Sequence, residues 1–254
     1  MPSEQAQFFR ENGWLRVEDV LTRQEADQAR GELLLLAKQG AGNKDSHVKA
    51  LASSDYQRMA QAVNEPARFS PFFRRLATSE KIGKLMRDVM GFPEIRLFRD
   101  LGLIKPPESE KGIATGVHQD QVFYPLDRGG VASLWLALVD LPSNSGTMRF
   151  VPGSNKWGPV GRFVLPGQDW IASHPEDKAK LTPPPALPAG SGTIHDGFTL
   201  HGADPNTWGQ PRIAYTMAFF RSDALFTGMP SRWTDGLGLS VDMPLDHDLF
   251  PIVH

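Results

Sequence analysis

The sequence predicts a mainly β fold in which short antiparallel strands form a barrel with flanking helices. Short apolar runs alternate with turn residues through the middle of the chain, and 24 glycines and 21 prolines supply many turns. A chain of 254 residues suffices for one large barrel domain with a substantial core. We expect a single domain over 1–254, with a helical part of about 1–92, a barrel core of about 93–225 and a C-terminal extension over 226–254.

The N-terminal part begins with a predicted short helix over 3–12 and a strand over 14–17. Thr22 and Glu25 have the spacing of a capping box, in which the side chain of each residue bonds to the backbone N–H of the other. This pair opens a helix that carries a run of core-packing leucines and ends at Gly40.

Three further segments complete the N-terminal part. The polar, glycine-containing stretch 40–54 is predicted to be a loop at the mouth of the site. A third helical segment is expected around 56–63, and another helix begins at 79–80 and ends at 90–91.

The barrel strands are predicted from apolar runs bounded by turn residues. The run 101–105 ends at two prolines, and the runs 133–138 and 147–151 are separated by an Asn-Ser-Gly turn. The proline-rich stretch 182–188 is the best candidate for a domain boundary, but we expect it to lead into the next barrel strand. One domain is therefore retained.

Composition excludes several classes of partner and site. A formal net charge of −2 gives no basic surface for nucleic acid, and the absence of cysteine excludes disulfides and thiolate ligands and favours nitrogen and oxygen ligands. No leader-like N-terminus or membrane-spanning apolar run is present. We expect a cytoplasmic protein without nucleic-acid or membrane partners, as a monomer or weak homodimer acting on a small molecule.

His118, Asp120 and the distant His201 are the most informative residues. Residues two apart on a strand project to the same face, so a strand at 118–120 would present both side chains to one metal, with His201 supplied by another strand. Two imidazoles and one carboxylate can occupy one face of an octahedral Fe(II) and leave the opposite face open for a co-substrate and O2. The sequence therefore predicts a non-haem iron site.

Two other clusters match a metal motif only formally. The segment 174–176 is His-Pro-Glu, and its central proline and neighbouring charges favour a surface turn. The segment 246–248 is Asp-His-Asp, to which we give little functional weight.

The chain resembles the phytanoyl-CoA dioxygenase family of Fe(II)/2-oxoglutarate oxygenases over most of its length. The resemblance is carried by motifs that occur in order: the start 8–15 (FFRENGWL), Lys105-Pro106-Pro107, His118-Gln119-Asp120, 151–155 (VPGSN), and 201–206 (HGADPN) through Pro211-Arg212. It implies a double-stranded β-helix, also called a jelly roll or cupin-like barrel. It also implies Fe(II) held by His118, Asp120 and His201, with 2-oxoglutarate and O2 as co-substrates.

The resemblance further assigns the co-substrate contacts. Arg212 follows His201 by eleven residues, the spacing of the family's basic residue for the distal carboxylate of 2-oxoglutarate, and its spacing favours His201 over the competing His195. A planar guanidinium suits two parallel hydrogen bonds to a carboxylate. We expect His195 to pack nearby. Further candidate contacts are Gln119, Trp135, which otherwise fills the barrel, Thr147, and Lys105, which otherwise marks a strand end.

The activity implied is a dioxygenase that oxidises, foremost by hydroxylation, an unactivated C–H bond of a small molecule in natural-product biosynthesis, converting 2-oxoglutarate to succinate and CO2. Desaturation, ring closure and epimerisation are further outcomes of the same chemistry. Related halogenases carry Gly or Ala in place of Asp120, so halogenation is disfavoured. Two alternatives remain open: a redox-neutral cupin-like metal enzyme (isomerase or hydrolase), and a catalytically silent ligand-binding barrel. Candidate substrate contacts are Phe123, Tyr124, Arg128, Trp157 and Trp170.

Overall fold

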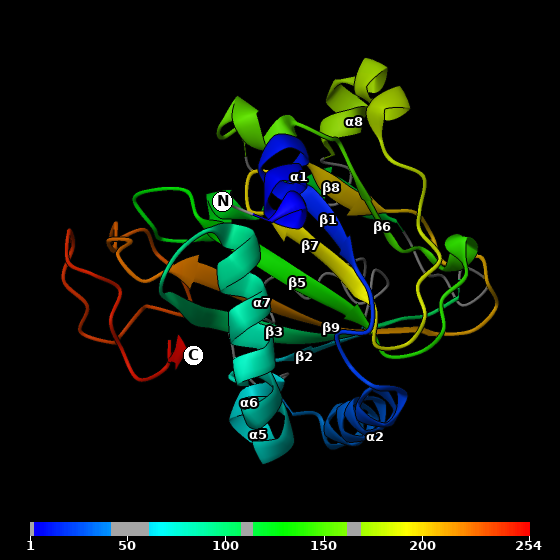
Figure 1. Cartoon of the computed structure of the whole chain (residues 1–254), viewed down its shortest axis with the longest axis horizontal. Helices are drawn as coiled ribbons and strands as arrows, with labels where there is room; N and C mark the ends of the chain where they lie inside the picture. Colours follow the sequence, from blue (N-terminus) through cyan, green and yellow to red (C-terminus); the bar gives the residue numbers. More distant parts are fainter. Residues whose placement is uncertain (1–2, 42–60, 108–113, 162–168) are drawn as a thin grey trace.

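Two antiparallel sheets face each other at the centre of the molecule (Figure 1). The structure is a computed structural model that describes residues 3–41, 61–107, 114–161 and 169–254. In this part of the chain, the larger sheet has the strand order β1 (Trp14–Val17), β7 (Gly192–Asp196), β5 (Val131–Ala137), β9 (Arg212–Arg221), β3 (Ile95–Lys105) and β10 (Ile252–Val253), and β2 (Gln61–Asn64) also pairs with β3. The smaller sheet has the order β4 (Thr115–His118), β8 (His201–Ala203) and β6 (Met148–Phe150).

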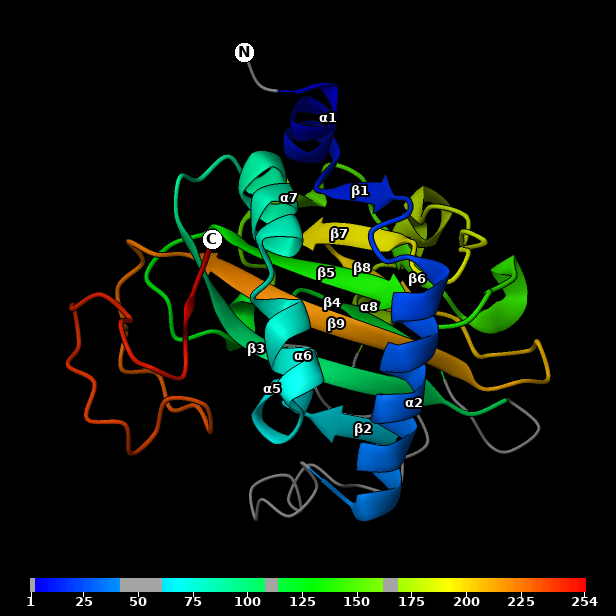
Figure 2. The ribbon, with the colours of Figure 1, turned by 60° about the horizontal axis from the view of Figure 1, so that its bottom comes forward.

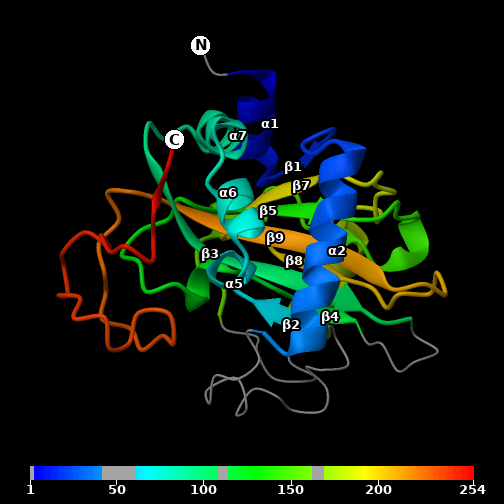
Figure 3. The same ribbon diagram turned by 90° about the horizontal axis from the view of Figure 1, so that it is seen from below.

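Helices cover the outer face of the larger sheet (Figures 2 and 3). Those of the N-terminal part are α1 (Glu4–Asn12), α2 (Arg23–Gln39), α5 (Pro66–Phe69), α6 (Pro71–Ala77) and α7 (Glu80–Met90). Later in the chain come α8 (Trp170–Ser173) and the 3-10 turns η2 (Gln121–Phe123), η3 (Ser143–Ser145), η4 (Ser154–Trp157) and η5 (Pro175–Lys180). No helix in the described residues combines the length and apolar character that a membrane crossing requires.

Strand β5 shows how the sheet separates the core from the site. Every residue of the strand is buried, because both faces are covered. Leu134 and Leu136 belong to the apolar cluster under the helices, whereas Trp135 and Ala137 belong to the cluster between the two sheets. The two-residue period of a strand thus directs Ser133 and Trp135 to the inner face.

The helix boundaries follow the predicted caps. Thr22 and Glu25 form the capping box of α2, and Gly40 ends that helix in the left-handed conformation. Ser3 caps α1 and Ser79 caps α7, each by accepting a backbone N–H. These local signals were sufficient because a cap depends on residues within one turn of each other.

The helix expected around 56–63 is wrong where the structure describes it. Residues 42–60 lie outside the described residues, as does most of the predicted loop 40–54. Residues 61–64 form β2, which pairs with the 101–104 segment of β3. Pairing with a neighbouring strand overrides local preference in so short a segment. Helices α5 and α6, each with a proline in its first turn, were also not predicted.

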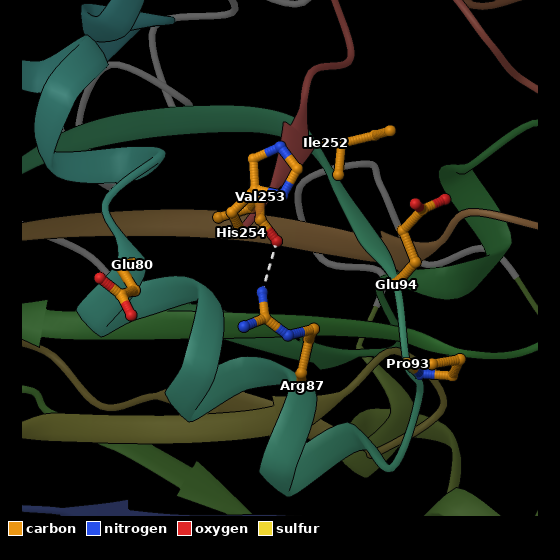
Figure 4. Close-up of a pocket in the computed structure, with 7 residues that line it drawn as sticks. All are labelled: Glu80, Arg87, Pro93, Glu94, Ile252, Val253 and His254. Carbon is orange, nitrogen blue, oxygen red and sulfur yellow. Dashed lines mark hydrogen bonds between the residues drawn. The ribbon is translucent and has the colours of Figure 1, made fainter.

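The C-terminal extension is fixed against the end of the larger sheet. Phe250 stacks on Phe98 with ring centroids 5.1 Å apart, and β10 pairs with β3. A groove between α7 and this segment is lined by Glu80, Arg87, Pro93, Glu94 and residues 252–254 (Figure 4). In it, Arg87 Nη1 donates to the carbonyl of Val253 at 2.7 Å.

Gly192 is a glycine that the sheet requires. A Cβ on Gly192 would lie 1.9 Å from the backbone oxygen of Trp135, which cannot move without distorting the β5–β7 pairing. We expect Gly192→Ala to lower the free energy of unfolding by at least ~1–3 kcal/mol. The matched Gly31→Ala, in the exposed middle of α2 with nothing within 4 Å of the new methyl group, should raise it by up to about 1 kcal/mol. Denaturant unfolding measures both, and equal effects would contradict this account.

Candidate metal centre

Three potential ligands converge between the two sheets. His118 is the last residue of β4 and His201 the first residue of β8, and they are direct partners in the antiparallel register. Asp120 Oδ1 lies 3.6 Å from His118 Nε2 and 3.8 Å from His201 Nε2. One ligand atom from each of the three residues lies within 4.8 Å of the others, a spacing that could hold a metal ion.

Asp120 reaches this position from outside the strand, contrary to our reasoning from strand parity. Strand β4 ends at His118, and Asp120 has helical backbone angles (φ −77°, ψ −41°) at the start of η2. The chain therefore bends after His118 and brings the carboxylate back toward the imidazoles. The three predicted residues do lie together, but a turn rather than a regular strand places Asp120 beside the two histidines.

Hydrogen bonds orient both imidazoles with Nε2 toward the centre. His118 Nδ1 lies 2.8 Å from the carbonyl oxygen of Gly116, and His201 Nδ1 lies 2.8 Å from that of Thr199. A carbonyl can only accept, so each Nδ1 carries the proton in the neutral ring. The lone pair of each Nε2 is left to bind a metal.

Protonation of the three groups also favours a cation. Burial lowers the pKa of His201 well below its ordinary value, so its ring is neutral. Burial opposes ionisation of Asp120, but His201, His118 and His195 together hold its pKa well below the ordinary value. Burial likewise opposes protonation of His118, but the contact with Asp120 raises its pKa. A divalent ion would replace that proton beside the carboxylate.

His195 also contacts Asp120, and its ring lies beside that of His201, with centroids 4.2 Å apart. Its Nε2 lies 3.3 Å from Asp120 Oδ2, the oxygen that also accepts a hydrogen bond from Ser133 Oγ at 3.0 Å. The position agrees with the expectation that His195 packs beside the metal site while His201 completes the triad. Ser133 was not anticipated, although its inward parity with Trp135 could have indicated it.

A second group of buried polar side chains lies along the inner face of the larger sheet. Lys105 and Arg212 are direct partners on β3 and β9, and Trp135 and Thr193 are direct partners on β5 and β7. The Arg212 guanidinium carbon lies 5.4 Å from the centroid of the Trp135 ring. Within the described residues, Arg212 Nε, Trp135 Nε1 and Thr193 Oγ1 are buried and have no hydrogen-bond partner.

Both cations of this group are short of acidic partners. Lys105 Nζ donates to the backbone oxygen of Asp204 at 2.9 Å, and Arg212 Nη1 donates to that of Gly146. Burial, with the neighbouring Arg212 second, lowers the pKa of Lys105 to about 7, and burial lowers that of Arg212 to about 10. Two buried cations with free donors form a ready site for an anion.

Two predicted co-substrate contacts are occupied by structural hydrogen bonds. The Gln119 amide donates to the carbonyl oxygens of Gly158 and Phe198 and accepts from Val160 N–H. The Thr147 hydroxyl donates to the carbonyl oxygen of Pro185. In this arrangement neither side chain has a proton left for a carboxylate, and both side chains tether loops. Such distant backbone partners were not visible in the sequence.

The predicted substrate residues divide into two groups. Tyr124 is buried, and its hydroxyl accepts a hydrogen bond from Arg99 Nε at 3.3 Å in the surroundings of Asp120. Phe123 precedes it as the last residue of η2. These two positions remain candidate substrate contacts.

The other three candidates have different surroundings. Arg128 is bound to Asp127 near the surface, and Trp157 is exposed, with Lys180 Nζ 5.6 Å from its ring centroid. Trp170 packs against Val117 and Leu200. These two residues adjoin His118 and His201 in the chain and so face the opposite side of the smaller sheet, which means that Trp170 covers the outer face of that sheet. Its stacking on His174, 3.6 Å between centroids, accounts for the 174–176 cluster without a metal. The described contacts of Arg128, Trp157 and Trp170 are thus with other protein groups.

Comparison with known proteins identifies the architecture. The family model for phytanoyl-CoA dioxygenase (PhyH) matches residues 9–214. A Bos taurus protein named phytanoyl-CoA dioxygenase domain-containing protein 1 is 31% identical over 154 residues, which covers 58% of this chain and 52% of that protein. The chain thus matches about half the length of the bovine relative.

Two solved structures extend the match over the whole fold. The carbocyclase SnoK from nogalamycin biosynthesis aligns with a TM-score of 0.77 and 25% identity over 100% of this chain and 97% of its own. The epimerase SnoN, in complex with Fe3+, alpha ketoglutarate and nogalamycin RO, aligns with a TM-score of 0.76 and 25% identity over 98% and 97%. These matches confirm the predicted jelly roll and the predicted cofactors, iron and 2-oxoglutarate.

The residues of this chain fit both iron and 2-oxoglutarate. Two neutral Nε2 atoms and one ionised carboxylate are the donor set of non-haem iron oxygenases. The buried donors of Arg212, Trp135 and Thr193, with the ammonium of Lys105, would satisfy a carboxylate that has left water.

Removal of one candidate ligand should weaken metal binding. We expect His201→Ala and Asp120→Ala each to weaken Co(II) binding by more than about 100-fold, beyond the range seen for outer hydrogen-bond partners. His174→Gln, which removes a histidine that stacks on Trp170, should leave the affinity unchanged. Calorimetric titration with Co(II) measures each value, and an affinity shared by all three variants would exclude this triad as the metal site.

Proposed function

The chain belongs to the phytanoyl-CoA dioxygenase family, and so to the iron- and 2-oxoglutarate-dependent oxygenase superfamily of enzymes; on that premise we propose that it hydroxylates an unactivated C–H bond of a small molecule in natural-product biosynthesis. The observation that carries the proposal is the pairing of a His-Asp-His metal site with two buried cations on the inner face of the same barrel. The first suits iron and the second suits an anionic co-substrate.

Each residue has a defined task in this proposal. His118, Asp120 and His201 hold Fe(II), which with 2-oxoglutarate and O2 supplies the oxidation of the C–H bond as succinate and CO2 are formed. Arg212 and Lys105 bind the distal carboxylate of 2-oxoglutarate and fix its direction. Trp135 and Thr193 line the same region and offer two further donors.

The direction of substrate approach follows from the exposure of the triad. The side chains of His118 and Asp120 are 21% and 15% exposed, whereas that of His201 is 3% exposed. Tyr124 and Arg99 lie near these two more exposed ligands: the charge of Asp120 acts on Tyr124 and that of Arg99 acts on His118, and Arg99 lies 4.5 Å from the centroid of the Trp233 ring. We assign substrate contacts to Tyr124, Phe123 and Arg99.

The alternatives account less well for the buried cations. A redox-neutral metal enzyme or a silent barrel needs the triad but gives no reason to bury Lys105 and Arg212 where, in the described residues, neither forms an ion pair with a carboxylate. Burial of unpaired charge opposes folding, so such groups persist where a ligand uses them. The retained Asp120 carboxylate disfavours halogenation. SnoK and SnoN are named as a carbocyclase and an epimerase, so the choice between hydroxylation and these outcomes depends on how the substrate is held.

Anaerobic absorption spectroscopy tests the proposal without a known substrate. Fe(II)-loaded protein should develop a weak visible charge-transfer band that saturates with 2-oxoglutarate. Arg212→Ala should retain Fe(II) and require at least about tenfold more 2-oxoglutarate, because a charged hydrogen-bond pair is lost, whereas His201→Ala should lose the iron itself. Absence of the band in wild-type protein that contains Fe(II) would refute the proposed function and favour the alternatives.

The pH dependence of 2-oxoglutarate binding tests Lys105. Its free-state pKa of about 7 means that the ammonium is present below pH 7 and must take up a proton for anion binding above it. The dissociation constant of 2-oxoglutarate should therefore rise above pH 7, by up to about tenfold per pH unit until the lysine of the complex also titrates.

The matched variant is Lys105→Met, which keeps the apolar stem and removes the charge. It should bind 2-oxoglutarate more weakly than wild type at pH 6. Its dissociation constant should also lack the rise above pH 7 that the lysine causes. Titration of the charge-transfer band between pH 6 and 9 gives both profiles. Identical profiles would show that Lys105 does not contact the co-substrate.

A further inference from the structure

The two oxygens of the Asp120 carboxylate have different surroundings. Oδ1 faces the Nε2 atoms of His118 and His201 at 3.6 and 3.8 Å. Oδ2 accepts from Ser133 Oγ at 3.0 Å and from His195 Nε2 at 3.3 Å. The two oxygens therefore have different partners: Oδ1 is near two potential metal ligands, and Oδ2 is near two hydrogen-bond donors.

The donors to Oδ2 are fixed by the larger sheet. Ser133 on β5 and His195 on β7 are direct partners in the antiparallel register, so their side chains stand side by side on the inner face. Both are almost fully buried, at 3% and 2% exposure. The β5–β7 pairing thus presents two donors at one point, while Asp120 arrives from the turn after the smaller sheet.

The protonation pattern of His195 is the reverse of that in the triad. His195 meets an ionised carboxylate through Nε2, so Nε2 must carry the proton and donate. Its Nδ1 is buried and has no hydrogen-bond partner in the described residues. His118 and His201 carry the proton on Nδ1 and turn bare Nε2 atoms to the centre. The three rings therefore have distinct tasks, two as ligands and one as a donor.

We propose that Ser133 and His195 are positioning residues that hold Oδ2 of Asp120 and so restrict the carboxylate to presenting Oδ1 to the metal. This inference rests on the proposed function. With Oδ2 held, Asp120 would offer a bound metal one oxygen, and its second oxygen would not compete with the co-substrate. Without these donors the carboxylate can rotate and offer both oxygens, which weakens the fixed geometry and competes with the chelating 2-oxoglutarate.

Co(II) binding to the full chain tests the proposal without substrate. Ser133→Ala removes a single oxygen, and His195→Leu removes the ring donor while filling part of its volume. Each should weaken Co(II) binding by about 10- to 100-fold, the range for loss of an outer hydrogen bond to a metal ligand. His195→Gln keeps an N–H donor and should recover most of the loss, and the remote His174→Gln should match wild type.

A spectroscopic readout separates positioning from packing. At saturating Co(II), the visible absorption spectrum reports the number and arrangement of ligands, and it should change in Ser133→Ala and His195→Leu but not in His195→Gln. Thermal unfolding of the metal-free proteins identifies any variant that fails to fold, and Ser133→Ala then carries the test alone. Wild-type affinity and an unchanged spectrum in both Ser133→Ala and His195→Leu would overturn the inference.

The same titrations distinguish this failure from failure of the proposed function. If Co(II) binding by the wild-type protein does not depend on Asp120, the metal centre itself is wrong and both proposals fall. If binding depends on Asp120 but is insensitive to Ser133 and His195, only the positioning role is excluded.

Discussion

The site depends on one carboxylate that connects the two sheets. Asp120 follows the smaller sheet, where it faces His118 and His201, and it is held from the larger sheet by Ser133 and His195. The sheets must therefore close to a defined separation before the metal ligands can meet. Trp135, Phe150 and their neighbours pack between the sheets and set that separation. The positions of the metal ligands therefore depend on the packing of this core.

The inner surface of the barrel, with a metal bound, would carry more positive than negative charge. An ionised Asp120 balances only part of the charge of a divalent metal. Lys105 and Arg212 add positive charge, and in the described residues neither forms an ion pair with a carboxylate, although the charge of Asp204 acts on Lys105. A dianionic chelating acid would supply negative charge at both places, with one end at the metal and the other end at the two cations. The charge pattern therefore selects the kind of co-substrate more firmly than it selects the substrate.

The sequence was most informative where chemistry depends on residue type and order. The triad, the capping box and the family all followed from the printed residues. Arg212, Trp135 and Lys105, which were predicted to contact a co-substrate, are buried on the inner face of the larger sheet. The hydrogen bonds of Gln119 and Thr147 could not be predicted, because their partners are backbone carbonyls brought near by distant loops. The same holds for β2, which exists because β3 lies beside it.

The unequal sheets have a consequence for the lifetime of the protein. The strands of the smaller sheet are three or four residues long, whereas β3 and β9 have 11 and 10 residues. Local opening costs least where few backbone hydrogen bonds must break, so the smaller sheet is the natural point of entry for a protease. A metal held by His118 and His201 binds only the closed form and adds its binding free energy to closure. The iron supply of the cell would then govern how long the enzyme survives as well as how fast it works.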